Sequence, residues 1–358
     1  MNPKGGCKIK KLLVALVMLL LTTSLIVAAT RVAFIYVSPI GDGAYTFMHD
    51  QGRLFLEETL GKDVVVDIIE SVPESAEAES VFRGYAQRGY DIIFGTSFGY
   101  MDSMVKVSQQ FPKTTFMHCS GYKATDNLGV YFGRMYEPRF LSGLVAGAMT
   151  TSNIIGYVAA YPIPEVIRGI NAFALGVSYV NPAAKVHVVW SNTWFDPTLE
   201  KDAAISLLDV GADVIAQHQN SPSPQQAAEE RGVLSIGYNS DMSAYAPNAF
   251  LAAPVWNWGH YYVRAVRAVQ NGTWTNESYW EGIDHEIVDI VLSDLVPDGV
   301  ANLVHAMRES IIKDQFHPFQ GPIYDQEGTL RYAQGEFASD AELLSMDWFV
   351  SNVVGRLQ

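Results

Sequence analysis

The sequence predicts an α/β protein made of two doubly wound domains joined by a hinge. Short apolar runs rich in β-branched residues alternate with helical patterns, which is typical of a parallel sheet with helices on both faces. The alternation stops near residue 150 and starts again at Ile154, so it forms two blocks and not one large sheet. The chain of 358 residues is 49% hydrophobic and 17% charged, which provides enough apolar material for two ordered domains.

The first block begins with a buried strand at Val32–Val37 and a helix at Phe47–Leu60, whose apolar residues recur at helical spacing. Further strands are expected at Val64–Ile69, Asp91–Phe94, Thr114–Cys119 and Asn127–Phe132, with helices at Glu77–Arg88, Tyr100–Phe111 and Pro138–Met149. The second block has expected strands at Ile154–Ala159, Val186–Trp190, Val214–Gln217 and Leu234–Tyr238, with helices at Glu165–Tyr179, Thr198–Val210 and Gln225–Arg231. Two more helices are expected, at Gly259–Gln270 and near Asp340–Val354.

The first 29 residues have the three-part layout of a secretory signal peptide. A basic head of four lysines precedes a nearly all-apolar run from Leu12 to Leu21, and Val27-Ala28-Ala29 supplies the small residues that a signal peptidase reads. The alternative is an uncleaved membrane anchor, because the apolar stretch that starts at Leu12 reaches the lower length limit of a spanning helix. Cleavage is the favoured reading, since three polar residues at 22–24 interrupt the stretch.

The net charge excludes polyanions as partners. Removal of residues 1–29 lowers Lys and Arg from 24 to 20 while Asp and Glu stay at 38, which leaves a charge of −18. A surface this acidic repels nucleic acid and anionic lipid, so neither is expected to bind. The one cysteine that remains, Cys119, lies in an apolar run and is read as a packing residue and not as part of a disulfide.

Three loops lie where an expected strand ends and a helix begins, the position at which open α/β sheets bind ligands. The first, Ser38–Thr46, approaches a dinucleotide fingerprint, but the third glycine of that fingerprint is missing. The second, Gly95–Gly99, matches Gly-x-Ser-x-Gly, so Ser97 is a candidate nucleophile of a secreted hydrolase. Glycines around a small polar residue also occur in any tight turn, and no oxyanion-hole segment of the His-Gly-Gly-Gly type precedes this one.

The third loop, Trp190–Pro197, carries two tryptophans ahead of a helix. Trp190 is expected to pack in the core, whereas Trp194 lies beside polar residues and could present its face to a flat ligand. Asp196 is expected to cap the following helix. The sequence lacks metal-ligand spacing, because His285-Glu286 has no second histidine four residues on, and no metal or cofactor is expected.

Further motifs are spread along about residues 31–358. These are the Asp42–Gly52 loop and helix, Phe140-Leu141-Ser142-Gly143, Ile155-Gly156-Tyr157-Val158, Gly169-Ile170-Asn171-Ala172-Phe173 with Gly176, Asn181-Pro182, Gly211-Ala212-Asp213-Val214-Ile215, Gly237-Tyr238-Asn239-Ser240-Asp241 and Gly321-Pro322. In these motifs and their order the chain resembles the basic membrane protein family, the nucleoside- and purine-binding proteins of bacterial ABC importers.

The resemblance implies the type I periplasmic-binding-protein fold, which agrees with two α/β blocks. We expect residues 31–150 with about 253–290 to form the N-terminal domain, and residues 151–252 with about 291–358 to form the C-terminal domain. The ligand cleft is expected between the two domains.

The resemblance also suggests candidate ligand-binding residues. The family loop Asp-Lys-Ser-Phe-Asn falls on residues 42–46, so its base-stacking phenylalanine becomes Tyr45, and the second stacking aromatic falls on Trp194. The acidic residue that holds ligand hydroxyls or base edges falls on Asp241, and the lysine of the nucleoside binders is replaced by Trp256. The remaining candidates are the polar loop positions Asp42 and Thr46, and Ser97 with its neighbour Phe98 on the glycine-rich loop.

These observations predict the solute-binding subunit of an ABC importer, with no chemistry performed on the ligand. Tyr45 and Trp194 are expected to sandwich a purine base such as adenine, while Asp241 accepts hydrogen bonds from it. Trp256 is expected to fill the space that a ribose would need, since an indole cannot hold two hydroxyls. A nucleoside-binding protein of the same type, a secreted hydrolase that uses Ser97 and a membrane-anchored ligand sensor are the alternatives. We expect an exported monomer, in the periplasm or on the outer face of the cytoplasmic membrane, with a permease as its partner.

Overall fold

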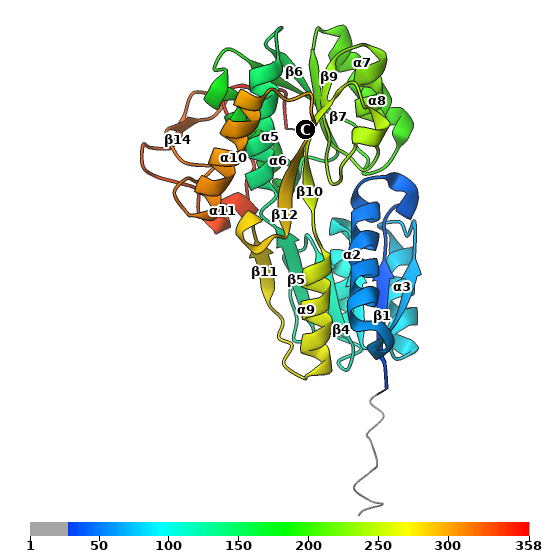
Figure 1. The fold of residues 1–358 in the computed structure, drawn as a ribbon. Coiled ribbons are helices and arrows are strands. Elements are labelled where there is room, and N and C mark those ends of the chain that lie inside the picture. The colour runs from blue at the N-terminus through cyan, green and yellow to red at the C-terminus, as the bar shows by residue number, and fades with distance from the viewer. Residues whose placement is uncertain (1–27, 358) are drawn as a thin grey trace, which may run out of the picture.

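The computed structural model describes residues 28–357, which form two α/β lobes stacked end to end (Figure 1). Each lobe has a mainly parallel sheet with helices against it, as the sequence predicts. The expected signal peptide lies outside the described residues, apart from its last two positions. Within the described part of the chain, none of the helices combines the length and apolar character needed to cross a membrane.

The first lobe is built on a six-stranded sheet in which every neighbouring pair is parallel, in the order β2-β1-β3-β4-β5-β11. Its strands are β1 (Thr30–Ile35), β2 (Val64–Ile69), β3 (Ile92–Gly95), β4 (Thr115–Cys119), β5 (Leu128–Gly133) and β11 (Ser278–Glu281). Its helices are α2 (Tyr45–Leu60), α3 (Ala76–Gln87), α4 (Met101–Ser108) and α9 (Gly259–Gln270). Gly52 lets α9 approach α2, because a β-carbon there would lie 2.7 Å from Cβ of Trp258.

The second lobe has a seven-stranded sheet in the order β12-β10-β9-β8-β6-β7-β15, parallel except for the β10–β12 pair. Its strands are β6 (Ile154–Ala159), β7 (Lys185–Trp190), β8 (Val214–His218), β9 (Leu234–Ile236), β10 (Phe250–Trp256), β12 (Val288–Leu292) and β15 (Val353–Val354). Its helices are α5 (Tyr136–Met149), α6 (Pro164–Val180), α7 (Pro197–Asp209), α8 (Ser223–Glu230), α10 (Asp298–Ile312) and α11 (Asp340–Leu344). A hairpin of β13 (Ile323–Tyr324) and β14 (Leu330–Tyr332) lies outside both sheets.

Helices α5 and α6 pack against each other through glycines. A β-carbon on Gly143 would lie 2.1 Å from the carbonyl oxygen of Phe173, and one on Gly176 would lie 2.1 Å from that of Phe140. Such distances are far inside van der Waals contact, so the two backbones touch only because both positions lack a side chain. This contact explains two of the motifs that carry the family resemblance, since both belong to one helix–helix interface.

The chain passes between the lobes three times, and these crossings lie away from the expected boundaries. They fall between β5 and α5, between β10 and α9, and between β11 and β12. Helix α5, expected in the first domain, instead packs against α6 and α10 in the second lobe (Figure 1). The boundaries expected at 253 and 290 fall inside β10 and β12, which pair with each other in the second sheet. Helical periodicity reveals a helix but not the sheet that it covers, which is why the boundary at 150 comes 14 residues after the start of α5 at Tyr136.

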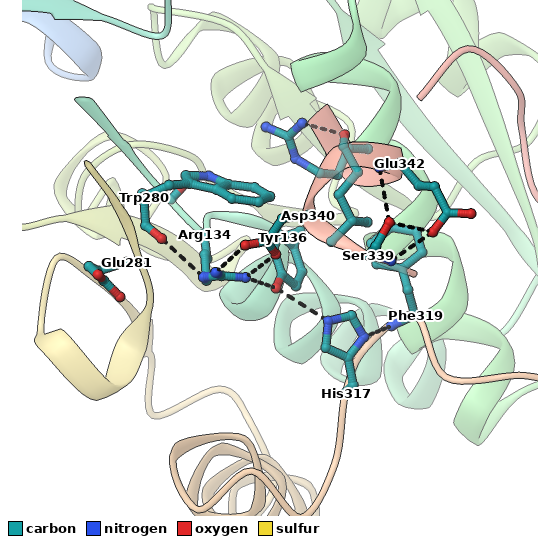
Figure 2. A network of polar contacts seen from close by, with 12 residues as sticks. Arg134, Tyr136, Trp280, Glu281, His317, Phe319, Ser339, Asp340 and Glu342 are labelled. Carbon is teal, nitrogen blue, oxygen red and sulfur yellow. Dashed lines mark hydrogen bonds and ion pairs between the residues drawn. The ribbon is translucent and has the colours of Figure 1, made fainter. Parts of the chain in front are cut away.

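A polar network fixes the first crossing to the C-terminal region (Figure 2). Arg134, between β5 and α5, makes two hydrogen bonds of 2.8 Å to the carboxylate of Asp340 at the start of α11. It also donates to the carbonyl of Trp280 and to the hydroxyl of Tyr136, both at 3.1 Å. Arg134 and Asp340 are 206 residues apart in the sequence, so this bidentate pair holds the C-terminal region against the first crossing.

The helix expected near 340–354 is wrong beyond its first turns. Helix α11 ends at Leu344, and the following residues extend to pair β15 with β7. The cause is Asn171 on α6, whose amide donates to the carbonyl of Trp348 at 2.7 Å and accepts from the amide of Val350 at 3.0 Å. These bonds satisfy the backbone of an extended segment, and no local sequence signal announces them.

Candidate ligand-binding site between the lobes

A pocket lies where the carboxyl ends of the two sheets face each other. The order of strands reverses beside β1 and β3 in the first sheet and beside β6 and β8 in the second, which are the switch points where open sheets bind ligands. The pocket encloses about 340 Å³, a volume that includes space open to solvent. Its lining residues are Val37, Tyr45, Ser97, Phe98 and Ser120 from the first lobe, and Glu165, Trp194, His218, Asn220 and Tyr238 from the second.

Four of the eight candidate residues line this pocket: Tyr45, Ser97, Phe98 and Trp194. Tyr45 is the first residue of α2, and its ring meets His49 edge to face at 4.4 Å. Its hydroxyl donates to the thiol sulfur of Cys119 at 3.3 Å, and burial raises the pKa of Tyr45 well above its ordinary value. Trp194 is half-buried in the loop between β7 and α7, on the other side of the cleft.

Asp42 and Thr46 are buried and do not line the pocket. The carboxylate of Asp42 accepts hydrogen bonds from the amides of Ala44 at 2.8 Å, Thr46 at 2.9 Å and Phe47 at 3.1 Å. It also accepts from the hydroxyl of Ser38 at 2.8 Å, although burial still raises the pKa of Asp42 to about 6. Asp42 therefore stabilises the turn before α2 and so positions Tyr45, but its own side chain does not face the pocket.

Asp241 and Trp256 are also placed away from the pocket, contrary to expectation. Asp241 is exposed, and its carboxylate accepts from the amide of Ser243 at 2.9 Å. Trp256 is 1% exposed, stacks on Trp258 at 4.3 Å and donates its indole N–H to the Asn239 side chain at 2.9 Å. The family motifs locate both residues in the sequence, but the direction of a side chain depends on tertiary packing. Trp256 cannot exclude a ribose, because it belongs to the core.

A polar wall that the sequence reasoning missed completes the pocket. Nε2 of His218, at the end of β8, lies 3.2 Å from Oε1 of Glu165, in the first turn of α6. Burial lowers the pKa of His218 to about 4, so the imidazole is neutral at neutral pH. Asn220 follows two residues later, and all three side chains face the pocket. The available signal was their position after strands of the second sheet, where carboxyl ends gather polar groups.

A buried arginine lies behind this wall. Arg139 on α5 is fully buried, and the centre of its guanidinium group lies 3.5 Å from the ring centroid of Tyr238. Its Nη1 donates to the carbonyl of Gln217 at 2.7 Å, directly before His218. The guanidinium charge therefore lies against Tyr238, a pocket residue, and it adds to the lowering of the pKa of His218.

The Gly-x-Ser-x-Gly motif forms the turn after β3. The hydroxyl of Ser97 donates to Oε1 of Glu74, and Nε2 of His118 lies 2.7 Å from the main-chain carbonyl of Ser97, away from the hydroxyl. A β-carbon on Gly95 would lie 2.4 Å from the sulfur of Met104, so this glycine makes room for α4. This geometry places the carboxylate of Glu74, and not the histidine of a Ser-His pair, on the serine hydroxyl.

Comparison with known proteins identifies the family of the chain. A family model described as ABC transporter substrate-binding protein PnrA-like matches residues 29–317. A purine-binding protein of Brucella abortus is 42% identical over 91% of this chain and 93% of its own length. A putative ABC transporter glucose-binding protein of Haloferax volcanii is 40% identical over 82% of this chain and 75% of its own length.

Solved structures share the fold. An ABC transporter solute-binding protein from Aeropyrum pernix aligns with a TM-score of 0.70 and 21% identity, over 80% of this chain and 92% of that chain. An activator of the comK gene from Bacillus halodurans aligns with a TM-score of 0.69, also at 21% identity, over 80% of this chain and 99% of that chain. The family resemblance deduced from the sequence is confirmed, and the chain belongs to the Bmp family of PnrA-like ABC transporter substrate-binding proteins.

Proposed function

We propose that this protein is the extracytoplasmic solute-binding subunit of an ABC importer and that it binds a purine base in the pocket between the lobes. The observation that carries the proposal is that Tyr45 and Trp194, which come from opposite lobes, line one pocket of about 340 Å³. Two aromatic faces on a flat heterocycle contribute about 1–3 kcal/mol per stacking partner. The relative from Brucella abortus is named a purine-binding protein, which supports the same ligand class.

The polar wall suits the edge of a purine. Glu165 offers a carboxylate that accepts from N–H groups, whereas the Asn220 amide can both donate and accept. Ser97 and Ser120 place hydroxyl groups on the opposite side of the pocket. A purine presents both N–H donors and bare ring nitrogens around its rim, so it can satisfy a wall of this mixed character.

We favour a free base such as adenine over its nucleoside, because a ribose adds several hydroxyls that need partners when they are buried. The preference for a base over a nucleoside depends on the pocket and not on Trp256, because Trp256 lies in the core. A sugar is the second candidate, since pyranose rings also stack on aromatic faces and since one relative is named as a putative glucose-binding protein.

Calorimetric titration with adenine, adenosine and glucose tests the proposal. Adenine should bind most tightly, and Trp194→Ala should weaken it by about tenfold or more, since the loss of one stacking face costs about 1–3 kcal/mol. Trp194→Phe keeps a flat aromatic ring and should retain most of the affinity. Tighter binding of glucose than of adenine would replace the purine by a sugar, and tighter binding of adenosine would replace the base by its nucleoside.

A further inference from the structure

We infer that Glu74 is a positioning residue that latches the two lobes together over the ligand and fixes the plane of Trp194. This inference rests on the proposed ligand-binding role of the cleft. Glu74 lies in the loop between β2 and α3 of the first lobe, whereas Trp194 belongs to the second lobe. The indole Nε1 of Trp194 donates to Oε2 of Glu74 at 3.2 Å, so a single side chain spans the mouth of the cleft.

The other carboxylate oxygen holds Glu74 to its own lobe. Oε1 accepts the hydroxyl of Ser97 and the amide N–H of Gly99, the latter at 2.7 Å. A β-carbon on Gly99 would lie 2.5 Å from Cδ of Glu74, so the glycine creates the space that the carboxylate occupies. The Gly-x-Ser-x-Gly loop is thus built around this carboxylate, which gives the motif a role without a nucleophile.

Trp194 is held from its own side as well. Its indole meets the ring of Tyr161 edge to face at 5.1 Å, and Tyr161 lies in the loop after β6. Burial and the nearby charge of Glu74 both raise the pKa of Tyr161. Tyr161 restrains one edge of the indole and Glu74 holds the N–H, so together they fix the ring face that lines the pocket.

The bond between Glu74 and Trp194 must break when the lobes separate, because its two partners are attached to different sheets. Glu74 is exposed and returns to water on opening, so the bond adds only a modest stabilisation to the closed form. A weak bond of this kind suits a protein that has to release its ligand. It should slow ligand escape by about three- to tenfold, as expected for one charge-assisted hydrogen bond near the surface.

Glu74→Gln separates the two contacts of the side chain, the one with Ser97 and Gly99 and the one with Trp194. An amide has one oxygen, and if that oxygen stays with Ser97 and Gly99, the NH2 group faces the indole N–H and two donors oppose each other. Glu74→Asp keeps the charge but is one methylene shorter, so it cannot reach both lobes. Glu77→Gln removes a neighbouring exposed acid on α3 and serves as the matched control.

The decisive measurement is the indole N–H resonance of Trp194 in proton–nitrogen spectra of the protein with and without adenine, assigned with Trp194→Phe. Glu74→Gln and Glu74→Asp should shift it, whereas Glu77→Gln should not. An unchanged resonance in both Glu74 variants would overturn the latch, whether or not adenine binds.

Stopped-flow release of adenine then measures the consequence, with faster release expected in both Glu74 variants and no change in Glu77→Gln. Wild-type release rates in both variants would also overturn the latch. If adenine fails to bind the wild-type protein, the proposed ligand is wrong, while the spectrum still tests the bond.

Discussion

Nε2 of His218 lies 3.2 Å from a carboxylate oxygen of Glu165, yet the imidazole is held in its neutral form. Burial lowers the pKa of His218 from its ordinary value of 6.5 to about 4, and the positive charge of Arg139 acts in the same direction. The unfolded chain therefore takes up a proton at a higher pH than the folded protein does. The stability contributed by this depressed pKa is fully present above pH 6.5 and is lost as the pH falls towards 4.

His218→Gln should therefore reduce the loss of stability that occurs as the pH falls. Between about pH 7 and about pH 4.5, the melting temperature of the wild type should fall more than that of the variant. His285→Gln is the control: His285 donates a hydrogen bond to the carboxylate of Asp284, which raises the pKa of that exposed histidine, so its contribution has the opposite sign and is screened by solvent. Parallel curves for His218→Gln and the wild type would contradict the neutral, buried imidazole.

Gly143→Ala should destabilise the protein, because the added methyl group would meet the carbonyl of Phe173 on α6. Forcing one carbon into such a contact costs about 1–3 kcal/mol, measured as a loss in the free energy of unfolding by urea. Gly84→Ala is the matched control, since Gly84 lies in α3 with no neighbouring atom within 4 Å of the new carbon. That change should be neutral or stabilising by about 0.5–1 kcal/mol. Equal effects at both positions would show that α5 and α6 can separate freely.

Trp256→Phe should lower stability and leave ligand selectivity unchanged. The change removes the hydrogen bond to Asn239 and part of the stack on Trp258, which costs about 1–3 kcal/mol in the free energy of unfolding. The ratio of adenine to adenosine affinity should stay within about twofold of the wild type, because the side chain does not line the pocket. A large change in that ratio with unaltered stability would return Trp256 to the ligand site.

Ser97 should resist a fluorophosphonate probe. Its hydroxyl donates to Glu74, and the neighbouring His118 contacts the main chain, so Ser97 lacks the contact with a histidine that activates the serine of a Ser-His hydrolase. Intact-protein mass spectrometry should therefore find no covalent adduct that is lost in Ser97→Ala. Such an adduct, together with ester turnover that disappears in the same variant, would establish a hydrolase.

Periodicity was sufficient to predict the fold class and most of its elements. The strand at Val64–Ile69 and the helix at Gly259–Gln270 have the predicted bounds, because a run of β-branched residues and an amphipathic helix carry strong local patterns. Strand β11 and helix α10 were not predicted, and the boundary between the lobes was misplaced at α5. In these places the deciding contacts come from remote partners, such as the pairing of β11 with β5.

The candidate site was also predicted only in part, because remote contacts decide where its side chains lie. Tyr45 and Trp194 line the pocket, since both follow a strand and both were read from loop motifs. Asp42 binds its own turn, and the indole of Trp256 turns into the core, because a motif fixes the position of a residue and not the direction of its side chain. Glu165 and His218 were missed because no local motif marks them, and only the topology of the second sheet brings them together.

The three crossings also govern how the protein can be assembled. Strand β11 completes the edge of the first sheet, but it is made only after β6–β10 of the second lobe have been synthesised. Neither lobe is therefore one continuous stretch of chain, and no single truncation yields an intact half. The first lobe must wait for residues 278–281 before its sheet is finished, so the two halves should gain their final stability together and melt in one cooperative step.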